Sequence, residues 1–274
     1  ARAIADIGPV RVDAFHLRPV AIGAGDFDDR TSKTRRLDGI YTTIAPTKGV
    51  GIDAYWLGYE NEAARFADRT GREWRDTFGL RLFGQHGDLG WNWEAMLQRG
   101  HFDGQTIRAW SLATETAWSF RAAPLKPRLR LRANIASGDR DATDDRLGTF
   151  NALFPKGKYF GELSPIGPRN IVNVHPSVDF DLGKGITVEL VAARFWRESR
   201  GDGIYDIPGN LNRPAGGSDA RHIGDQIEIS AGWQASTLLS FSASLSTFRP
   251  GAFIRDTGPA RTIHMFGAEA MLKL

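Results

Sequence analysis

The chain contains no cysteine and no apolar run long enough to cross a membrane as a helix. Its 274 residues therefore form neither disulfides nor thiolate metal sites. A membrane-spanning helix needs about 20 consecutive apolar residues, and the apolar runs here are far shorter. The mean hydropathy is -0.33, but this value does not exclude a membrane protein. A strand that alternates apolar and polar residues lowers the average while keeping one apolar face, as the strands of β-barrel membrane proteins do.

Lysine is also scarce, because only seven of the 35 basic residues are lysine and 28 are arginine. Guanidinium groups pair with carboxylates and phosphates in a planar fork that lysine does not offer. A GC-rich genome would produce the same bias, and both explanations stay open. The 32 acidic residues are spread throughout, and no basic run is interleaved with aromatic residues. Nucleic-acid binding is therefore not expected.

What the chain does contain is a two-faced β pattern that recurs about twelve times. Its clearest example opposes four apolar side chains to four serines: Leu239, Phe241, Ala243 and Leu245 against Ser240, Ser242, Ser244 and Ser246. Side chains alternate between the faces of a strand, so such a segment has one apolar and one polar face. The predicted strands are 9–22, 37–45, 49–60, 73–86, 89–101, 105–120, 127–137, 170–183, 185–198, 221–235, 237–249 and 260–274.

The connections between these strands alternate in length. The short ones are 46–48, 87–88, 121–126, 184 and 235–236, and the long ones are 23–36, 61–72, 138–169, 199–220 and 250–259; only 102–104 is short where a long loop is expected. Outer-membrane barrels have short periplasmic turns and longer external loops. The sequence therefore predicts an all-β fold, an antiparallel up-and-down transmembrane β-barrel with about twelve strands, as one domain over residues 1–274. The chain lacks an initiator methionine and a leader, and we expect it to begin inside a longer protein.

Arginines supply the candidate transport path. Arg128, Arg130 and Arg132 share one face of a predicted strand, opposite Leu129 and Leu131. Charged groups on a lipid-facing surface cost about 2 to 4 kcal/mol each near the bilayer midplane, so we expect the arginines to line the lumen. Weaker candidates for the same path are Arg75, Arg81 and Arg197. The alternative is that these arginines only pair with acids on neighbouring strands, such as Glu94, Glu115, Asp179, Asp181 and Glu228.

Other residue types give no comparable signal. We expect the eight tryptophans to form interfacial girdles more than sugar-stacking platforms. The aspartates at 139, 141, 144 and 145 match no calcium loop, and the six histidines have no metal-ligand spacing, so neither a metal nor a cofactor is expected. A soluble polyuronate lyase could use His175 beside Asn173, but no partner can be placed and the alternating loops would be unexplained. We therefore expect no enzyme.

Several unusual strings from residue 133 onward carry a resemblance. They are SGDRD at 137–141, LGTFNALFPKGKYFG at 147–161, FWRES at 195–199, DGIY at 202–205, ARHIG at 220–224 and FRPGAFIRDTG at 248–258. Over 133–274 the chain resembles the alginate-export family of outer-membrane barrels. The resemblance implies an eighteen-stranded barrel, so the chain would be either the C-terminal two-thirds of one or a smaller relative.

The same resemblance implies a function and a location. It implies passive export of an anionic polysaccharide, alginate or a related polyuronate, across the bacterial outer membrane. The implied partners are that polysaccharide, outer-membrane lipid and periplasmic export machinery. The alternative is a general porin-type channel for small solutes.

Overall fold

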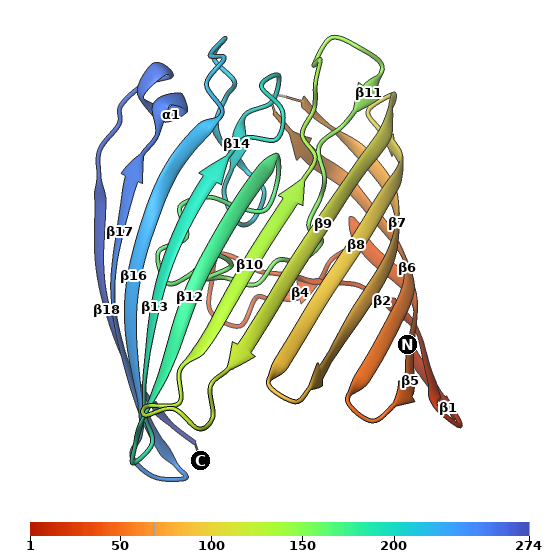
Figure 1. The fold of residues 1–274 in the computed structure, drawn as a ribbon. Helices are drawn as coiled ribbons and strands as arrows, with labels where there is room; N and C mark the ends of the chain where they lie inside the picture. Colours follow the sequence, from red (N-terminus) through yellow and green to blue (C-terminus); the bar gives the residue numbers. More distant parts are fainter. Residues whose placement is uncertain (68, 274) are drawn as a thin grey trace.

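Most of the chain forms one curved antiparallel sheet, as the computed structural model of residues 1–67 and 69–273 shows (Figure 1). Within the described residues, thirteen strands follow one another in the sheet in chain order. They are β1 (Arg2–Ile7), β2 (Val10–Leu17), β5 (Arg35–Thr47), β6 (Val50–Phe66), β7 (Arg69–His86), β8 (Leu89–Phe102), β9 (Gln105–Ser119), β10 (Arg128–Ala136), β12 (Ile171–Gly183), β13 (Ile186–Trp196), β16 (His222–Gln234), β17 (Leu239–Pro250) and β18 (Ile263–Leu272). The predicted all-β, up-and-down architecture is confirmed.

The remaining elements are short. β3 (Val20–Ala21) pairs with β4 (Arg30–Thr31), β14 (Ile204–Tyr205) pairs with β15 (Leu211–Arg213), and β11 (Arg146–Leu147) adds to the main sheet parallel to β9. The helix α1 (Ala252–Asp256) has five residues. Across the described residues, no helix is both long and apolar enough to span a membrane.

The distribution of apolar and polar side chains between the two faces of the sheet is the reverse of that in a soluble protein. On the convex face large apolar side chains are exposed, for example Leu245 at 56% and Ile227 at 66%. Their neighbours Ser246 and Glu228 are buried on the concave face. This arrangement suits a sheet with lipid outside and a polar interior, because each strand then hides its polar residues from the acyl chains.

The observed ends of the strands differ from several of the predicted ones. Short turns gather at one end of the sheet and the long loops gather at the other (Figure 1). The predicted loop 61–72 is wrong, because β6 continues to Phe66 and β7 begins at Arg69; Asp68, inside that loop, lies outside the described residues. The predicted strand 9–22 stops at Leu17. β1 is not among the twelve predicted strands, and Leu274, the last residue of the predicted strand 260–274, lies outside the described residues.

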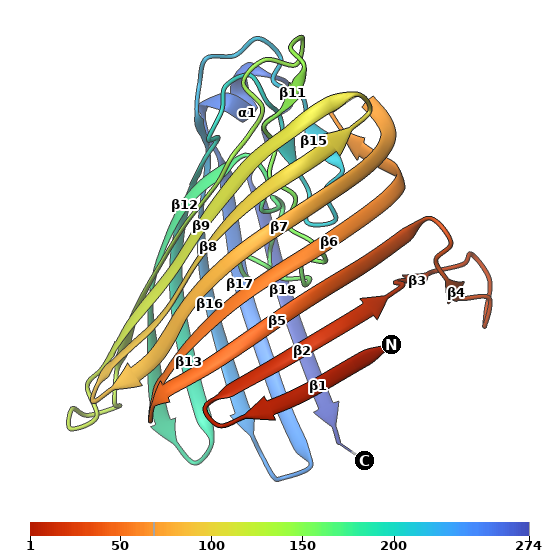
Figure 2. The ribbon, with the colours of Figure 1, turned by 90° about the vertical axis from the view of Figure 1, so that its right-hand side faces the viewer.

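The edges of the sheet are β1 and β18, so the sheet is open in the described part of the chain (Figure 2). Every neighbouring pair along the path is antiparallel, and an odd number of strands runs from one edge to the other. β1 and β18 therefore run in the same direction.

A long connection between β10 and β12 folds back into the concave side of the sheet (Figure 1). We call residues 137–170 the inner loop. Its buried side chains Phe150, Phe160 and Ile166 belong to the same apolar cluster as Phe102 and Ile107 of the wall. The apolar core of the molecule thus lies inside the sheet near its loop end, between the wall and the inner loop.

Candidate functional site

The three arginines of β10 lie on the concave face of the sheet, opposite the exposed Leu129 and Leu131. Arg130 Nη2 donates to both carboxylate oxygens of Asp179, at 2.7 and 2.6 Å, and to Glu189 Oε1 at 3.1 Å. Arg132 donates to Glu115 Oε2 through Nη2 at 3.0 Å and Nε at 3.2 Å. These two arginines are therefore partly compensated by acids on adjacent strands.

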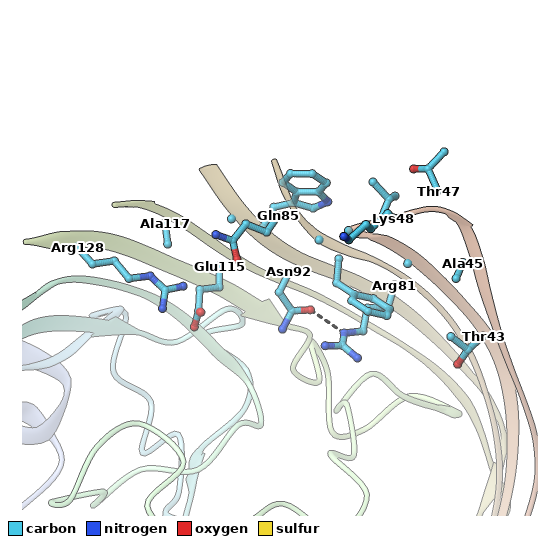
Figure 3. Close-up of a pocket in the computed structure, with 17 residues that line it drawn as sticks. Thr43, Ala45, Thr47, Lys48, Arg81, Gln85, Asn92, Glu115, Ala117 and Arg128 are labelled. Carbon is cyan, nitrogen blue, oxygen red and sulfur yellow. Dashed lines mark hydrogen bonds between the residues drawn. The ribbon is translucent and has the colours of Figure 1, made fainter. Parts of the chain in front are cut away.

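Arg128 differs from the other two, because its side chain is exposed in the interior. Among residues 1–67 and 69–273, no carboxylate oxygen lies within 4 Å of its guanidinium. It lines a cavity of about 670 Å³ at the short-turn end, together with Lys48, Arg81 and Glu115 (Figure 3). Arg81 is held there by Asn92 Oδ1 at 2.6 Å and Asp53 Oδ2 at 3.2 Å.

A second cavity, of about 160 Å³, lies between the wall and the inner loop. We call it the wall–loop pocket. It is lined by cations from two directions and by two acids and several neutral groups: Arg130, Arg132, Lys156, Lys158, Tyr159, Phe160, Gly161, His175, Ser177, Glu189, Val191 and Glu228. The positive charge contributed by the inner loop was not expected from the strand pattern.

Two nitrogen atoms of the wall–loop pocket have no hydrogen-bond partner among the described residues. They are Nε2 of His175, a residue that is 4% exposed, and Nε of Arg130. The His175 ring packs against Phe160 and Phe195, with centroids 5.4 and 5.1 Å away, so the aromatic cluster fixes its plane. An unsatisfied buried polar atom is costly, and the side chains around these two nitrogens shield both of them from the interior.

Hydrogen bonds hold the inner loop against both sides of the wall. On one side, Gln98 Oε1 accepts from Asn151 N at 2.9 Å, and Gln98 Nε2 donates to Asn151 O at 2.8 Å. On the other side, Glu228 Oε2 accepts from Glu162 N at 3.0 Å and from Ser246 Oγ at 2.6 Å. Lys158 Nζ lies 2.7 Å from Glu162 and 3.7 Å from Glu269 of β18. The loop therefore narrows the interior, and Lys158 is held in place by two carboxylates.

Two of the predicted path residues are fully buried. Arg75 donates to Glu73 Oε1 at 2.6 Å, Gln98 Oε1 at 2.7 Å and Thr149 O at 3.3 Å. The inner loop covers it, so its guanidinium supports the loop and does not contact water in this structure.

Arg197 lies at the outer end of β13, where its guanidinium binds backbone carbonyls. It donates to the carbonyl oxygens of Ala220, Arg200, Asp202 and Ser218 at 2.6 to 3.1 Å. Its Cζ lies 3.9 Å from the centre of the Phe253 ring of α1. Arg197 thus ties the external loop after β13 to the loop after β17.

The unusual strings of the sequence meet around Asp202, close to Arg197. Its carboxylate accepts from Thr149 Oγ1 at 2.6 Å, Asp139 N at 3.0 Å, Tyr205 Oη at 2.7 Å and Gly203 N at 2.7 Å. Burial raises the pKa of Asp202. Burial also raises the pKa of Asp139 to about 6, and the nearby Asp202 charge adds to this shift. The strings therefore build an external loop cluster that supports the inner loop.

Sequence reasoning did not select Lys156 and Lys158, although both stand in one of the quoted strings. The sequence suggests a role for His175 only in a lyase site with Asn173. In the structure Asn173 Oδ1 accepts from Asn134 Nδ2 at 2.9 Å, and the His175 ring is enclosed by phenylalanines. In the part of the chain that the structure describes, no three His, Asp or Glu side chains are grouped to hold a metal ion.

Comparisons with known proteins agree with this architecture. The family model described as alginate export matches residues 1–268. A search of curated proteins finds no match. Among solved structures, Pseudomonas aeruginosa OccD3 (OpdP) superposes with a TM-score of 0.60 at 12% identity, over 99% of this chain and 67% of that one.

Two further Pseudomonas aeruginosa structures are similar at lower scores. OccK11 (OpdR) gives a TM-score of 0.47 at 12% identity, over 100% of this chain and 80% of that one. OccK2 (OpdF), solved in complex with glucuronate, gives 0.47 at 14% identity, over 100% and 81%.

Proposed function

Because the chain belongs to the alginate export family, a family of channels in the bacterial outer membrane, we propose that it lets an anionic polysaccharide, alginate or a related polyuronate, diffuse outward through an arginine-lined lumen. That the chain is an outer-membrane channel follows from the family and from the all-β, porin-like fold. The choice of solute, the role of the arginines and delivery of the polymer by periplasmic export machinery are the proposal.

The observation that carries the proposal is the wall–loop pocket. Two guanidinium groups from β10 and two ammonium groups from the inner loop line the same small cavity. A carboxylate that enters it meets guanidinium and ammonium donors, and both donor types form charge-assisted hydrogen bonds. The carboxylates of Glu189 and Glu228 line the same cavity and would accept hydrogen bonds from sugar hydroxyls.

Acidic side chains partly neutralise the arginines of the proposed path, which suits the passage of an anion. Asp179 and Glu189 contact Arg130, and Glu115 contacts Arg132, so the arginines attract an anion without holding it as tightly as unpaired cations would. Conduction requires binding that is strong enough for entry and weak enough for exit. Transport of this kind needs no cofactor.

The proposed path runs from the short-turn end to the loop end. Arg128 and Arg81 stand in the wide cavity near the short turns, and Arg130 and Arg132 follow at the wall–loop pocket. Arg75 and Arg197 support the loops and are left out of the path, because both are fully buried.

The test is conductance of the reconstituted protein in planar bilayers. We expect anion preference and a current that polyuronate oligomers block. The double variant Lys156→Ser with Lys158→Ser should raise the blocking concentration at least about tenfold, which corresponds to about 1.4 kcal/mol of lost attraction. The reason is that the loop contributes two of the four cations around the pocket.

The matched control is Lys126→Ser, which removes an exposed lysine that lies 3.1 Å from Asp181 near the short turns. It should leave the block unchanged. A channel that neutral and anionic oligomers affect equally would support the general porin-type alternative and would contradict the proposal.

A further inference from the structure

On the outward face of β8 and β9, the side chains change from apolar to basic between two successive outward residue pairs. Going toward the loop end, the outward pairs are Leu89 with Trp118, Trp91 with Thr116, Trp93 with Thr114, Ala95 with Leu112, Leu97 with Trp110, and then Arg99 with Arg108. The first five pairs consist of apolar residues and threonines, and the sixth consists of two exposed arginines. This arginine pair is separate from the lumen path, because it lies on the opposite face of the sheet.

The position of the pair matches the outer boundary of the membrane. Trp118 and Trp110 are eight residues apart on β9, which is about 27 Å along the strand and about 20 Å along the membrane normal at a tilt of about 40°. Arg108 is two residues further on, so it stands close to the edge of an apolar band about 25 Å tall. At this depth lipid headgroups replace acyl chains, and a charge costs about 0 to 1 kcal/mol.

The pair has no acidic partner in the residues that the structure describes. No carboxylate oxygen lies within 4 Å of Arg99 or Arg108, counting residues 1–67 and 69–273. Asp76 of β7 stands opposite Arg99 on the outward face, but it forms no ion pair with Arg99, and its Oδ1 accepts from Trp56 Nε1 at 2.8 Å. Like charges directly opposite each other destabilise an antiparallel pair, so an anion from outside the chain would stabilise these two arginines.

A third arginine completes the basic surface. β11 pairs with β9 in parallel, and its Arg146 stands opposite Thr106, on the same face as Arg108 and one step further out. Arg146 is exposed. Two other outward arginines near the loop end do have acidic partners, since Arg36 lies 2.7 Å from Glu60 and Arg194 contacts Asp225. We define Arg99, Arg108 and Arg146 as the outer arginine patch.

We propose that the outer arginine patch binds the anionic phosphate group of a phosphorylated glycolipid in the outer leaflet of the membrane, and not the charge-balanced phosphate of a zwitterionic lipid. Guanidinium groups bind phosphate through two parallel hydrogen bonds, and Arg99 and Arg108 present two such groups from adjacent strands. The lipid's acyl chains lie on the apolar surface directly below, formed by Leu97 and Trp110. The phosphate thus neutralises the patch where the apolar band ends.

The test compares thermal unfolding of the reconstituted chain in two kinds of vesicle. Both contain phosphatidylcholine, and one also contains a glycolipid with two phosphates such as lipid A, with the dephosphorylated glycolipid as its control. We expect the phosphorylated glycolipid to raise the unfolding midpoint of the natural sequence by about 5 °C. The variant Arg99→Gln with Arg108→Gln should lose at least half of this shift.

The same variant shows whether a lost shift reflects poor folding. In pure phosphatidylcholine it should unfold at the same or a higher temperature than the natural sequence, because the repulsion between the arginines is gone. Arg36→Gln, which removes an outward arginine with an acidic partner, should keep the full shift. The proposal is overturned if the dephosphorylated glycolipid stabilises equally, if Arg99→Gln with Arg108→Gln keeps the shift, or if Arg36→Gln loses as much.

Discussion

Serine at positions 128, 130 and 132 together should change the channel from anion preference to cation preference. The three positive charges leave the lumen wall, while Glu115, Asp179 and Glu189 remain without their arginine partners. Each lost charge changes the energy of a permeating ion by about 1 kcal/mol at about 8 Å, for an effective dielectric of about 40. We therefore expect the anion-to-cation permeability ratio to fall at least about tenfold, measured as a reversal potential in a salt gradient.

The barrel itself should survive this change. The backbone pairs of β10 with β9 and β12 do not involve the arginine side chains, and Leu129 and Leu131 still face lipid. The matched control is Arg194→Ser, which removes an outward arginine paired with Asp225 and should leave the reversal potential unchanged. An unaltered permeability ratio in the triple variant would show that the arginines only hold strands together.

The second large effect is expected at Arg197. Methionine at this position keeps most of the volume and removes all the hydrogen bonds to the four backbone carbonyl groups. It also removes the contact with the Phe253 ring. Hydrogen bonds from charged groups contribute about 1.5 to 3 kcal/mol each, so losing this set should cost the loops about 3 kcal/mol or more.

The loss of stability in the Arg197→Met variant should be confined to the external loop after β13. Amide hydrogen exchange in residues 198–221 should accelerate at least about 100-fold, because 1.4 kcal/mol corresponds to a factor of ten, while the amides of β13 and β16 stay protected by their ladder. Arg200→Met provides the control, since Arg200 is exposed and its guanidinium lies 3.8 Å from Asp219. Equal exchange rates in the two variants would show that Arg197 is not what fixes these loops.

The sequence predicts the membrane-embedded part of the fold well because one physical rule applies there. Where lipid covers the outside, apolar residues face outward and polar residues inward, and the segment around Leu245 and Ser246 follows this rule in full. The inward position of Arg128, Arg130 and Arg132 follows from the same rule.

The rule fails where the strands rise above the membrane. At the C-terminal end of strand β6, Ala64 and Phe66 are buried on the inner face, while Arg65 is exposed. Water surrounds this part of the wall and the inner loop covers its inner face, so the pattern of a soluble protein applies. The outward apolar residues stop before the strand does, so the sequence pattern predicts a loop at 61–72 where the strand in fact continues. The sequence does not predict β1 for another reason: its six residues give too little alternation to identify a strand.

The site could be predicted only in part, because the inner loop is placed by contacts that are distant in sequence. Burial of Arg75 depends on Thr149, which lies 74 residues further along the chain. Lys156 and Lys158 reach the lumen because the Asn151 and Glu162 backbones are held by Gln98 and Glu228. Nothing in the local pattern of a loop reveals such anchors, whereas a strand reveals its two faces directly.

The measurement that tests the account most directly is the environment of spin labels along β10. The chain has no cysteine, so labels can be placed singly at each position from 128 to 133. Labels at 129 and 131 should be relaxed by oxygen dissolved in the lipid, and labels at 128, 130 and 132 by a water-soluble nickel complex. Alternation of this kind would confirm that lipid lies outside and water inside, and the opposite alternation, or none, would contradict the account.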